Sequence, residues 1–261
     1  MERWAAKEAE RIQRWLRQKV EAAGAEGVVL GLSGGLDSAV VGALAARAFP
    51  GRAWALVLPC QSDPALVKGA QELGRSLGLQ VLTFDLTAAF EVLQATLAQE
   101  EDLRLPPEVR RLRDANLKPR LRMAALYHVA AGRRALVLGT SNRSERFIGY
   151  FTKWGDGGAD LLPIGHLLKR EVRELGRFLG LPEAVLKKPP SADLWPGQTD
   201  EGELGFTYDQ LDAYIAGERE GLPAAVCQMI EERHRKTAHK RFLPPDPGEE
   251  EEEYGRTFQM A

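Results

Sequence analysis

One stretch of this chain decides its fold: Gly31-Leu32-Ser33-Gly34-Gly35-Leu36-Asp37-Ser38. It follows the apolar run Val28-Val29-Leu30 and precedes an alanine-rich apolar run over 39–49. This order predicts a strand, a glycine turn and a helix. The backbone N–H groups of such a turn, together with the helix N-terminus, bind phosphate groups. The one carboxylate of the turn, Asp37, suits the Mg²⁺ that accompanies polyphosphates.

Two familiar phosphate-binding loops do not fit this stretch. A Walker A loop ends in Gly-Lys-Ser/Thr, whereas Leu36 follows Gly35 here and the loop contains no lysine. The dinucleotide fingerprint Gly-x-Gly-x-x-Gly requires a different glycine spacing. What remains, Ser-Gly-Gly-Leu-Asp-Ser, resembles the loop with which ATP pyrophosphatases grip pyrophosphate while ATP is cleaved to AMP. The alternative is an ordinary Gly-Gly turn in which Asp and Ser serve as helix caps.

Composition limits the partners of the chain. Its 261 residues are 44% hydrophobic and carry a formal net charge of -2, so no global basic field draws it to nucleic acid or to a membrane. Its two cysteines, Cys60 and Cys227, offer neither a disulfide framework nor zinc-ligand spacing. No apolar run approaches the ~20 residues of a membrane span, and the N-terminus has no apolar signal core. We therefore expect a cytoplasmic protein without a nucleic-acid or membrane partner.

Strand and helix patterns alternate along the chain. Apolar runs predict strands at 27–32, 53–58, 80–84 and 135–138. Helical periodicity and capping residues predict helices at 3–22, 37–49, 64–77, 87–99 and 169–179. This alternation predicts an α/β fold with a doubly wound, mostly parallel, Rossmann-like sheet between helices, in three layers. Ligands of such sheets bind beyond the carboxyl ends of the strands, where we expect the loops 31–38, 59–61 and 139–140 to meet.

The segment after Pro119 has a different character. After a polar break at 100–107 the helical pattern returns, and Pro119 begins a new segment. Residues 120–131 are apolar nearly all round, which predicts a helix that starts at Pro119 and is buried or packed at an interface. A basic cluster precedes this segment, at Arg104, Arg110, Arg111 and Arg113. Because no aromatic residues interleave with it and the net charge is negative, we interpret this cluster as a solvated helix face and not as a nucleic-acid site.

Motifs further along the chain make a family resemblance specific. They are NLKPRLRM at 116–123, GTSNRSE at 139–145, GYFTKWGDGGAD at 149–160, Lys169-Arg170, KPPSADL at 188–194 and TAHKR at 237–241. Together with the loop at 31–38, this ordered set resembles the NAD synthetases over nearly the whole chain. The resemblance implies the adenine nucleotide α-hydrolase-like fold of the ATP pyrophosphatase superfamily.

The resemblance implies a ligase that forms a C–N bond in the final step of NAD biosynthesis. In that reaction the nicotinate carboxylate of deamido-NAD attacks the α-phosphorus of ATP, pyrophosphate leaves and an acyl-adenylate forms. Ammonia then attacks the acyl carbon and AMP departs. A carboxylate becomes electrophilic only when its oxygen is made a good leaving group, so we expect catalysis to rest on positioning and charge stabilisation. ATP is the implied co-substrate and Mg²⁺ the implied metal.

The resemblance also implies roles for individual residues. The catalytic residues would be Asp37, Lys169 and Asp160, and the metal ligands Asp37 and Glu145. ATP would contact Gly31, Leu32, Ser33, Gly34, Gly35, Leu36, Asp37, Ser38, Thr140, Lys169 and Ser191. Deamido-NAD would contact Arg120, Lys153, Asp160, His239 and Lys240. The basic members of that last group suit a substrate that carries a pyrophosphate. We also hypothesise that Asp160 accepts a proton from the attacking ammonium.

Structural roles are the alternatives for several of these residues. Taken alone, Lys169 fits a solvated helix lysine and His239 a charged terminal stretch. Arg120 fits a cap or ion-pair partner at a helix start, and Asp160 a turn former. Two other functions are also open. One is another enzyme of the superfamily, such as a GMP synthetase-like amidase or a tRNA-thiolating enzyme. The other is a non-catalytic nucleotide-binding module, against which the paired carboxylates and the lysines argue.

Domain organisation follows from the same comparison. We expect one domain over 1–261, with a flexible acidic tail from about 245. About thirty residues precede the phosphate loop, far fewer than a glutaminase domain needs. Free ammonia is therefore the expected nitrogen source, and a separate glutaminase chain is not indicated. The resemblance implies a homodimer with the active site at the interface, and the glycines within 195–206 predict a mobile lid.

Overall fold

A parallel sheet in the strand order β3-β2-β1-β4 forms the centre of the molecule. The computed structural model describes residues 2–97, 105–191 and 197–244. The strands are β1 (Gly27–Gly31), β2 (Ala53–Val57), β3 (Gln80–Thr83) and β4 (Ala135–Leu138). Leu30 of β1 pairs with Ala55 of β2 and with Leu138 of β4. The predicted parallel, Rossmann-like α/β fold is thus confirmed, and the change of direction at β1 opens a crevice between β1 and β4.

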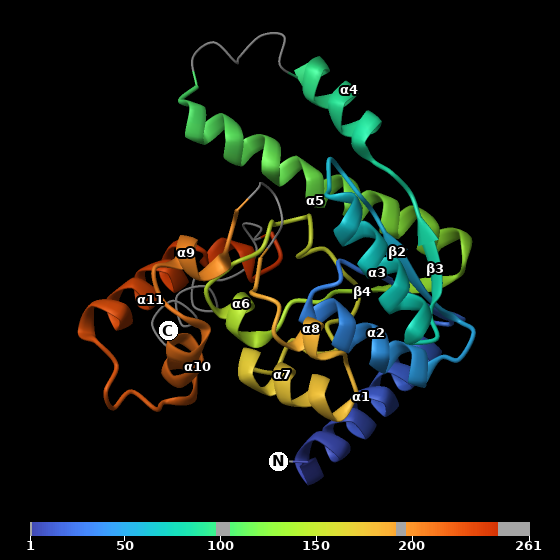
Figure 1. Cartoon of the computed structure of the whole chain (residues 1–261), viewed down its shortest axis with the longest axis horizontal. Helices are drawn as coiled ribbons and strands as arrows, with labels where there is room; N and C mark the ends of the chain where they lie inside the picture. Colours follow the sequence, from blue (N-terminus) through green and yellow to red (C-terminus); the bar gives the residue numbers. More distant parts are fainter. Residues whose placement is uncertain (1, 98–104, 192–196, 245–261) are drawn as a thin grey trace.

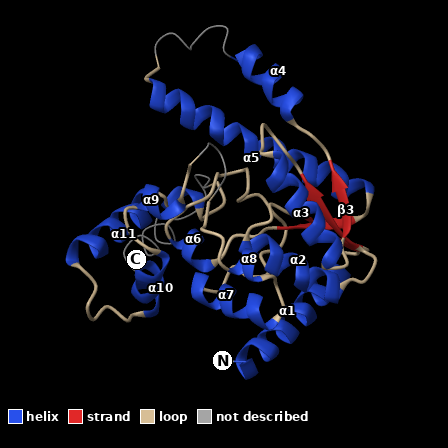
Figure 2. Cartoon of the chain, in the orientation of Figure 1, coloured by secondary structure: helices blue, strands red, loops and turns tan. Residues whose placement is uncertain are grey.

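Strand β1 is buried on both faces, because helices cover the sheet from both sides. Val28 and Leu30 pack into one core and Val29 into another, as the two-residue period of a strand requires. The first core contains α1 (Glu2–Ala22), α2 (Leu36–Ala48), α3 (Pro64–Ser76) and α7 (Lys169–Phe178). On the opposite face lies α5 (Pro107–Gly132), beside which runs α4 (Thr87–Leu97). Figures 1 and 2 show these three layers.

Helix α1 closes the first core with a single apolar face. Its buried residues are Ala5, Ala9, Ile12, Leu16 and Val20. Their spacing of three or four residues places them on one side of the helix. The helix thus forms where the sequence predicts it, and it packs against α2 and α7, the two helices whose N-termini border the candidate site.

The predicted return of helix after residue 107 is confirmed, but the expectation of a helix start at Pro119 is wrong. Pro119 lies inside α5, which is continuous from Pro107 to Gly132. A proline in a helix interior has no N–H to donate to the carbonyl four residues earlier, here that of Ala115, and usually kinks or ends the helix. Both residues are buried, so packing holds the helix together across the missing hydrogen bond. Within the segment 120–131, which its apolar sequence predicts to be buried or packed at an interface, only Ala130 is fully buried.

A second, helical core adjoins the sheet on the side of β4. It is built from α6 (Arg143–Phe147), α9 (Asp200–Leu204), α10 (Tyr208–Ala216) and α11 (Ala224–Lys236). In Figure 1 these helices lie together at the left of the sheet. Ile148, Tyr208, Leu211 and Ile230 are its largest fully buried side chains. Two short elements, α8 (Glu183–Leu186) and η1 (Ala238–Lys240), complete the chain.

Several expectations concern residues outside the described ranges. They are the tail from 245, Arg104 of the basic cluster, the last two residues of the helix 87–99 and residues 195–196 of the proposed lid. The described part of that lid contains helix α9, and its mobility stays a prediction. Within residues 2–97, 105–191 and 197–244, no helix is both long enough and apolar enough to span a membrane.

Candidate active site

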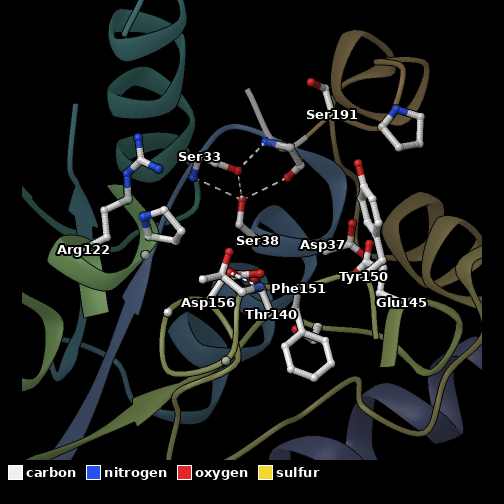
Figure 3. A pocket seen from close by; sticks show the side chains of 18 of the residues that line it. Ser33, Asp37, Ser38, Arg122, Thr140, Glu145, Tyr150, Phe151, Asp156 and Ser191 are labelled. Atoms are coloured by element: carbon white, nitrogen blue, oxygen red, sulfur yellow. Dashed lines mark hydrogen bonds between the residues drawn. The ribbon is translucent and has the colours of Figure 1, made fainter. Parts of the chain in front are cut away.

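The loop between β1 and α2 is held together by its own hydroxyl groups (Figure 3). Ser38 Oγ accepts a hydrogen bond from the backbone N–H of Ser33 at 3.3 Å and donates to the carbonyl of Gly35 at 3.1 Å. Ser33 Oγ accepts from the N–H of Gly35 at 3.2 Å. Gly34 has φ +77°, a left-handed conformation that glycine adopts without strain. The loop therefore curls ahead of the N-terminus of α2, as the phosphate-binding prediction requires.

A hollow of about 550 Å³ lies beyond the carboxyl ends of the strands. The loops after β1, β2 and β4 all line it, through residues of 31–38, through Pro59 and through Gly139-Thr140. The predicted convergence of these loops is therefore confirmed. Lys169 and Ser191, from distant parts of the chain, line the same hollow. Ser191 Oγ donates to the carbonyl of Gln198 at 2.8 Å.

Three charged side chains meet at one side of this hollow. Lys169 Nζ lies 2.5 Å from Asp37 Oδ2 and 3.1 Å from Glu145 Oε1. Each comes from the first turn of a different helix: Lys169 from α7, Asp37 from α2 and Glu145 from α6. Lys169 is only 3% exposed, so it is not the solvated helix lysine that its sequence context alone would suggest. We call Asp37, Glu145 and Lys169 the ionic triad.

Burial and charge act in opposite directions on the ionic triad. Burial alone would lower the pKa of Lys169, but the neighbouring Asp37 and Glu145 carboxylates outweigh it and hold that pKa above its ordinary value. Burial raises the pKa of Glu145 to about 7, although the Lys169 ammonium opposes this shift. With both carboxylates ionised, two negative charges face one positive charge. The ionic triad can therefore accept a further cation.

Asn142 connects the Asp37 carboxylate to the start of α6, which carries Glu145; the sequence analysis assigned it no role. Its Nδ2 donates to Asp37 Oδ1 at 2.9 Å, and its Oδ1 accepts from the N–H of Glu145 at 3.0 Å. Asn142 is fully buried and is the N-cap of α6, in a capping box with Glu145. An Asn followed three residues later by Glu is a sequence signal for such a box. It would have predicted the helix start, though not the contact with Asp37.

Asp212 of α10 supports the ionic triad from behind and was also missed. It is fully buried and accepts hydrogen bonds from the N–H of Arg170 at 2.7 Å, the N–H of Lys169 at 3.4 Å and the Ser144 hydroxyl. Its carboxylate thus caps the N-terminus of α7, where negative charge is favourable. The same carboxylate binds α6 through the residue next to Glu145. Asp212 therefore fixes the two helices that carry Lys169 and Glu145.

Four of the five residues expected to contact deamido-NAD form one connected group. Arg120 Nε donates to the carbonyl of Lys153 at 3.3 Å, and Lys153 Nζ donates to the carbonyl of His239 at 2.6 Å. Lys240 Nζ donates to the carbonyls of Gly149 and Phe151 at 2.9 Å and 2.8 Å. Among these four, Lys240 lines the hollow. The structure thus brings Arg120 and Lys153 near the end of the chain that carries Lys240, the member of the group that reaches the hollow.

Asp160, the fifth, is placed differently. Its Oδ1 accepts from the Tyr127 hydroxyl at 3.0 Å and its Oδ2 from the N–H of Val137 at 2.7 Å. Asp160 is not among the described residues that line the hollow, whereas Asp156 is. Burial raises the pKa of Asp156, whose Oδ1 accepts from the N–H of Thr152 at 2.9 Å. Asp156 belongs to the motif at 149–160, but no sequence pattern predicted a role for it. Proton acceptance by Asp160 stays a prediction.

Comparisons with known proteins agree on one family. The family model described as NAD synthase matches residues 8–244. The NH(3)-dependent NAD(+) synthetase of Carboxydothermus hydrogenoformans is 46% identical over 245 residues, which cover 94% of this chain and 98% of that protein. The enzyme of the same name from Syntrophomonas wolfei is 47% identical over 234 residues, with coverages of 90% and 92%.

Solved structures show the same likeness. The NMN synthetase from Francisella tularensis superimposes with a TM-score of 0.85 at 36% identity, covering 94% of this chain and 99% of that one. The NH3-dependent NAD synthetase from Campylobacter jejuni gives a TM-score of 0.76 at 31% identity, covering 93% and 98%.

The raised pKa of Glu145 makes a testable contribution to stability. The pKa of Glu145 is about 7 in the folded protein, above its ordinary value of 4.5. The folded state therefore binds the proton more tightly than the unfolded chain. This contribution to stability is full below pH 4.5 and is lost as the pH rises through about 7. We therefore expect the free energy of unfolding of the wild type, minus that of Glu145→Gln, to fall over this interval. Urea unfolding of the ligand-free proteins at a series of pH values measures this difference. The exposed Glu220→Gln is the control, and a pH-independent difference for Glu145→Gln would contradict the prediction.

Proposed function

The chain belongs to the NAD synthase family, and from this premise we propose that it amidates deamido-NAD with ammonia at the expense of ATP. The products are NAD, AMP and pyrophosphate, and the enzyme is a ligase that forms a C–N bond. The single observation that carries the proposal is the ionic triad at the end of the phosphate loop. It puts a buried ammonium and two carboxylates where the polyphosphate of ATP would lie.

The phosphate loop would hold the β- and γ-phosphates as they become pyrophosphate. The support is the closed turn at Ser33–Ser38 and the start of α2 directly after it. Lys169, kept protonated by its two carboxylate partners, would neutralise the charge that develops on the phosphoryl oxygens. Thr140 and Ser191 line the same hollow and would align the nucleotide. Positioning and charge, more than covalent chemistry, would then drive the transfer.

Mg²⁺ fits the oxygen donors of this site. Asp37 and Glu145 lie within 2.5 and 3.1 Å of a common ammonium, so both carboxylates reach one cation. Mg²⁺ takes one or two protein carboxylates and completes its shell with phosphate oxygens and water. When bound, it would neutralise the phosphates and stabilise the departing pyrophosphate. Asn142 would hold the Asp37 carboxylate in place relative to the start of α6, which carries Glu145.

Deamido-NAD would bind at the basic edge of the hollow. The support is a chain of hydrogen bonds in which Arg120 donates to the carbonyl of Lys153, and Lys153 donates to the carbonyl of His239. The next residue, Lys240, donates to the carbonyls of Gly149 and Phe151. The lysine and arginine side chains suit the pyrophosphate of deamido-NAD. Asp160 would orient this region through Val137 and Tyr127. A single catalytic domain and a cytoplasmic location also stay predictions, the latter in keeping with the free cysteines Cys60 and Cys227.

We also propose that the enzyme is a homodimer with the active site at the interface. The support is a set of exposed apolar side chains on α4 and α5, two helices that stand out from the body in Figure 1. Val92 and Leu97 of α4 are 68% and 60% exposed, and Val109 of α5 is 46% exposed. Exposed apolar side chains gathered on neighbouring elements mark interaction surfaces.

A second candidate substrate has a specific observation in its favour. The solved structure with a TM-score of 0.85 is that of an NMN synthetase. By the same chemistry, this chain would amidate the nicotinate mononucleotide, deamido-NMN. The two substrates share the reacting carboxylate and differ in the adenylate half.

One assay separates these candidates. The protein is mixed with ATP, Mg²⁺ and ammonium, and with deamido-NAD, deamido-NMN or xanthosine monophosphate in turn, and the amide product and pyrophosphate are measured. We expect NAD from deamido-NAD with a higher kcat/KM than NMN from deamido-NMN. A reversed preference would support the second candidate. Turnover of xanthosine monophosphate alone would favour a GMP synthetase-like enzyme, and nucleotide binding without turnover would favour a non-catalytic module.

Lys169→Met tests the ionic triad directly. Removing one preorganised charge from the transferring phosphoryl group is expected to lower kcat by about 100-fold or more. The exposed Lys236→Met on α11, whose partner is Glu232, controls for loss of a lysine charge. Steady-state kinetics in ATP and deamido-NAD measure the effect. An unchanged kcat in a folded Lys169→Met protein would refute the proposed role.

Charge substitutions on α4 test the homodimer. Val92→Glu combined with Leu97→Glu places two carboxylates in the proposed apolar contact and is expected to shift the protein towards the monomer, with loss of activity. Size-exclusion chromatography with light scattering gives the mass. Leu243→Glu, at an apolar side chain that is 79% exposed elsewhere on the surface, is the control. A variant that keeps the dimer mass would exclude α4 from the interface.

A further inference from the structure

A second hollow, of about 390 Å³, lies beside the candidate active site. It is bordered by α7, by α8 and by the segment 187–190 that follows α8. Four of its lining residues are basic and two are acidic: Arg173, Arg177, Lys187, Lys188, Glu183 and Glu201. We call it the outer basic hollow. Its balance of side-chain charge favours an anion.

The outer basic hollow adjoins the active-site hollow. Arg173, Lys188, Pro189 and Pro190 line both. Arg173 lies four residues after Lys169 on α7, so its side chain points to the same face of the helix, one turn further on. In the described part of the chain, no carboxylate forms an ion pair with the half-buried Arg173. Basic groups therefore run from the ionic triad, through Arg173, to the surface.

The outermost basic side chains are held weakly enough to exchange partners. Lys187 Nζ lies 3.1 Å from Glu183 Oε2, but the two side chains are 80% and 69% exposed. Arg177 pairs with Glu174 one turn away on the same helix, and its side chain is 51% exposed. Such exposed ion pairs contribute about 0–1 kcal/mol. A multiply charged anion would compete with these single carboxylates.

We propose that the outer basic hollow binds pyrophosphate as it leaves the active site, with Arg173 as the link between the two hollows. The inference rests on the proposed function, in which pyrophosphate is a product formed at the phosphate loop. The volume of the outer basic hollow, about 390 Å³, is more than ten times the ~30 Å³ that one water molecule occupies in the liquid. The hollow therefore has room for a hydrated pyrophosphate. The guanidinium of Arg173 can bind two phosphate oxygens at once, and Pro189-Pro190 form a wall of restricted backbone.

Product inhibition by inorganic pyrophosphate tests this inference. It is measured in the complete reaction for the wild type, Arg173→Gln, Arg173→Lys and the double variant Arg177→Gln/Lys187→Gln. Losing the Arg173 contact should raise the inhibition constant of pyrophosphate about tenfold or more, with a smaller change in the KM for ATP. Arg173→Lys should recover part of the affinity. The double variant should raise the constant about two- to threefold at low salt, with little effect at high salt.

Arg17→Gln removes the same charge from an exposed position on α1 and should leave the inhibition constant unchanged. An unchanged constant in folded Arg173→Gln would overturn the proposal. So would an equal rise in the inhibition constant and in the KM for ATP, because Arg173 would then serve ATP binding alone. An unchanged inhibition constant in the double variant Arg177→Gln/Lys187→Gln would show that these two side chains do not bind pyrophosphate. That result would overturn the proposal as well.

Calorimetric binding of inorganic pyrophosphate to the enzyme without other substrates separates this inference from the proposed function. If the wild type amidates neither deamido-NAD nor deamido-NMN, the proposed function is refuted. If Arg173→Gln nevertheless binds pyrophosphate more weakly than the wild type does, the pyrophosphate site is still supported. Equal binding of inorganic phosphate and pyrophosphate would reduce the hollow to a general anion site and overturn the proposal.

Discussion

The structure depends on one buried ammonium, that of Lys169 between Asp37 and Glu145. A charge removed from water is costly unless it is paired and hydrogen-bonded. Three helix N-termini therefore converge within hydrogen-bonding distance, so that this buried charge is paired. The same convergence places the loop at 31–38, one basic group and two carboxylates around one hollow. Folding and the proposed catalysis thus make the same demand on these side chains.

The supporting hydrogen bonds explain why the convergence is rigid. Asn142 connects Asp37 to the start of α6, and Asp212 connects the starts of α6 and α7. Both residues are fully buried. Replacing one partner of a buried charge network leaves the others unsatisfied, which costs more than the bond itself contributes. The geometry of the ionic triad is consequently set by residues that need not touch a substrate.

Local patterns in the sequence predict most of the fold. The strands, α1 and the helix after the phosphate loop follow from apolar periodicity and from glycine and proline positions. Pro119 was misjudged because its rule is local, whereas the packing that keeps α5 continuous is tertiary. In the site, motif order brought Asp37, Glu145 and Lys169 to attention. Asn142 and Asp212 escaped because their partners lie 105 and 42 residues away, and no spacing rule encodes such contacts.

The position of Asp212 has a consequence for how the enzyme is made. The phosphate loop is complete within the first forty or so residues, but the carboxylate that fixes Lys169 and the neighbour of Glu145 belongs to α10, close to the end of the described chain. Domains assemble as units while the chain emerges from the ribosome. A chain that stops short of α10 has the loop at 31–38 without the carboxylate that ties the starts of α6 and α7 together. The positions of Lys169 and Glu145 relative to each other are therefore set only once α10 has packed against α6 and α7.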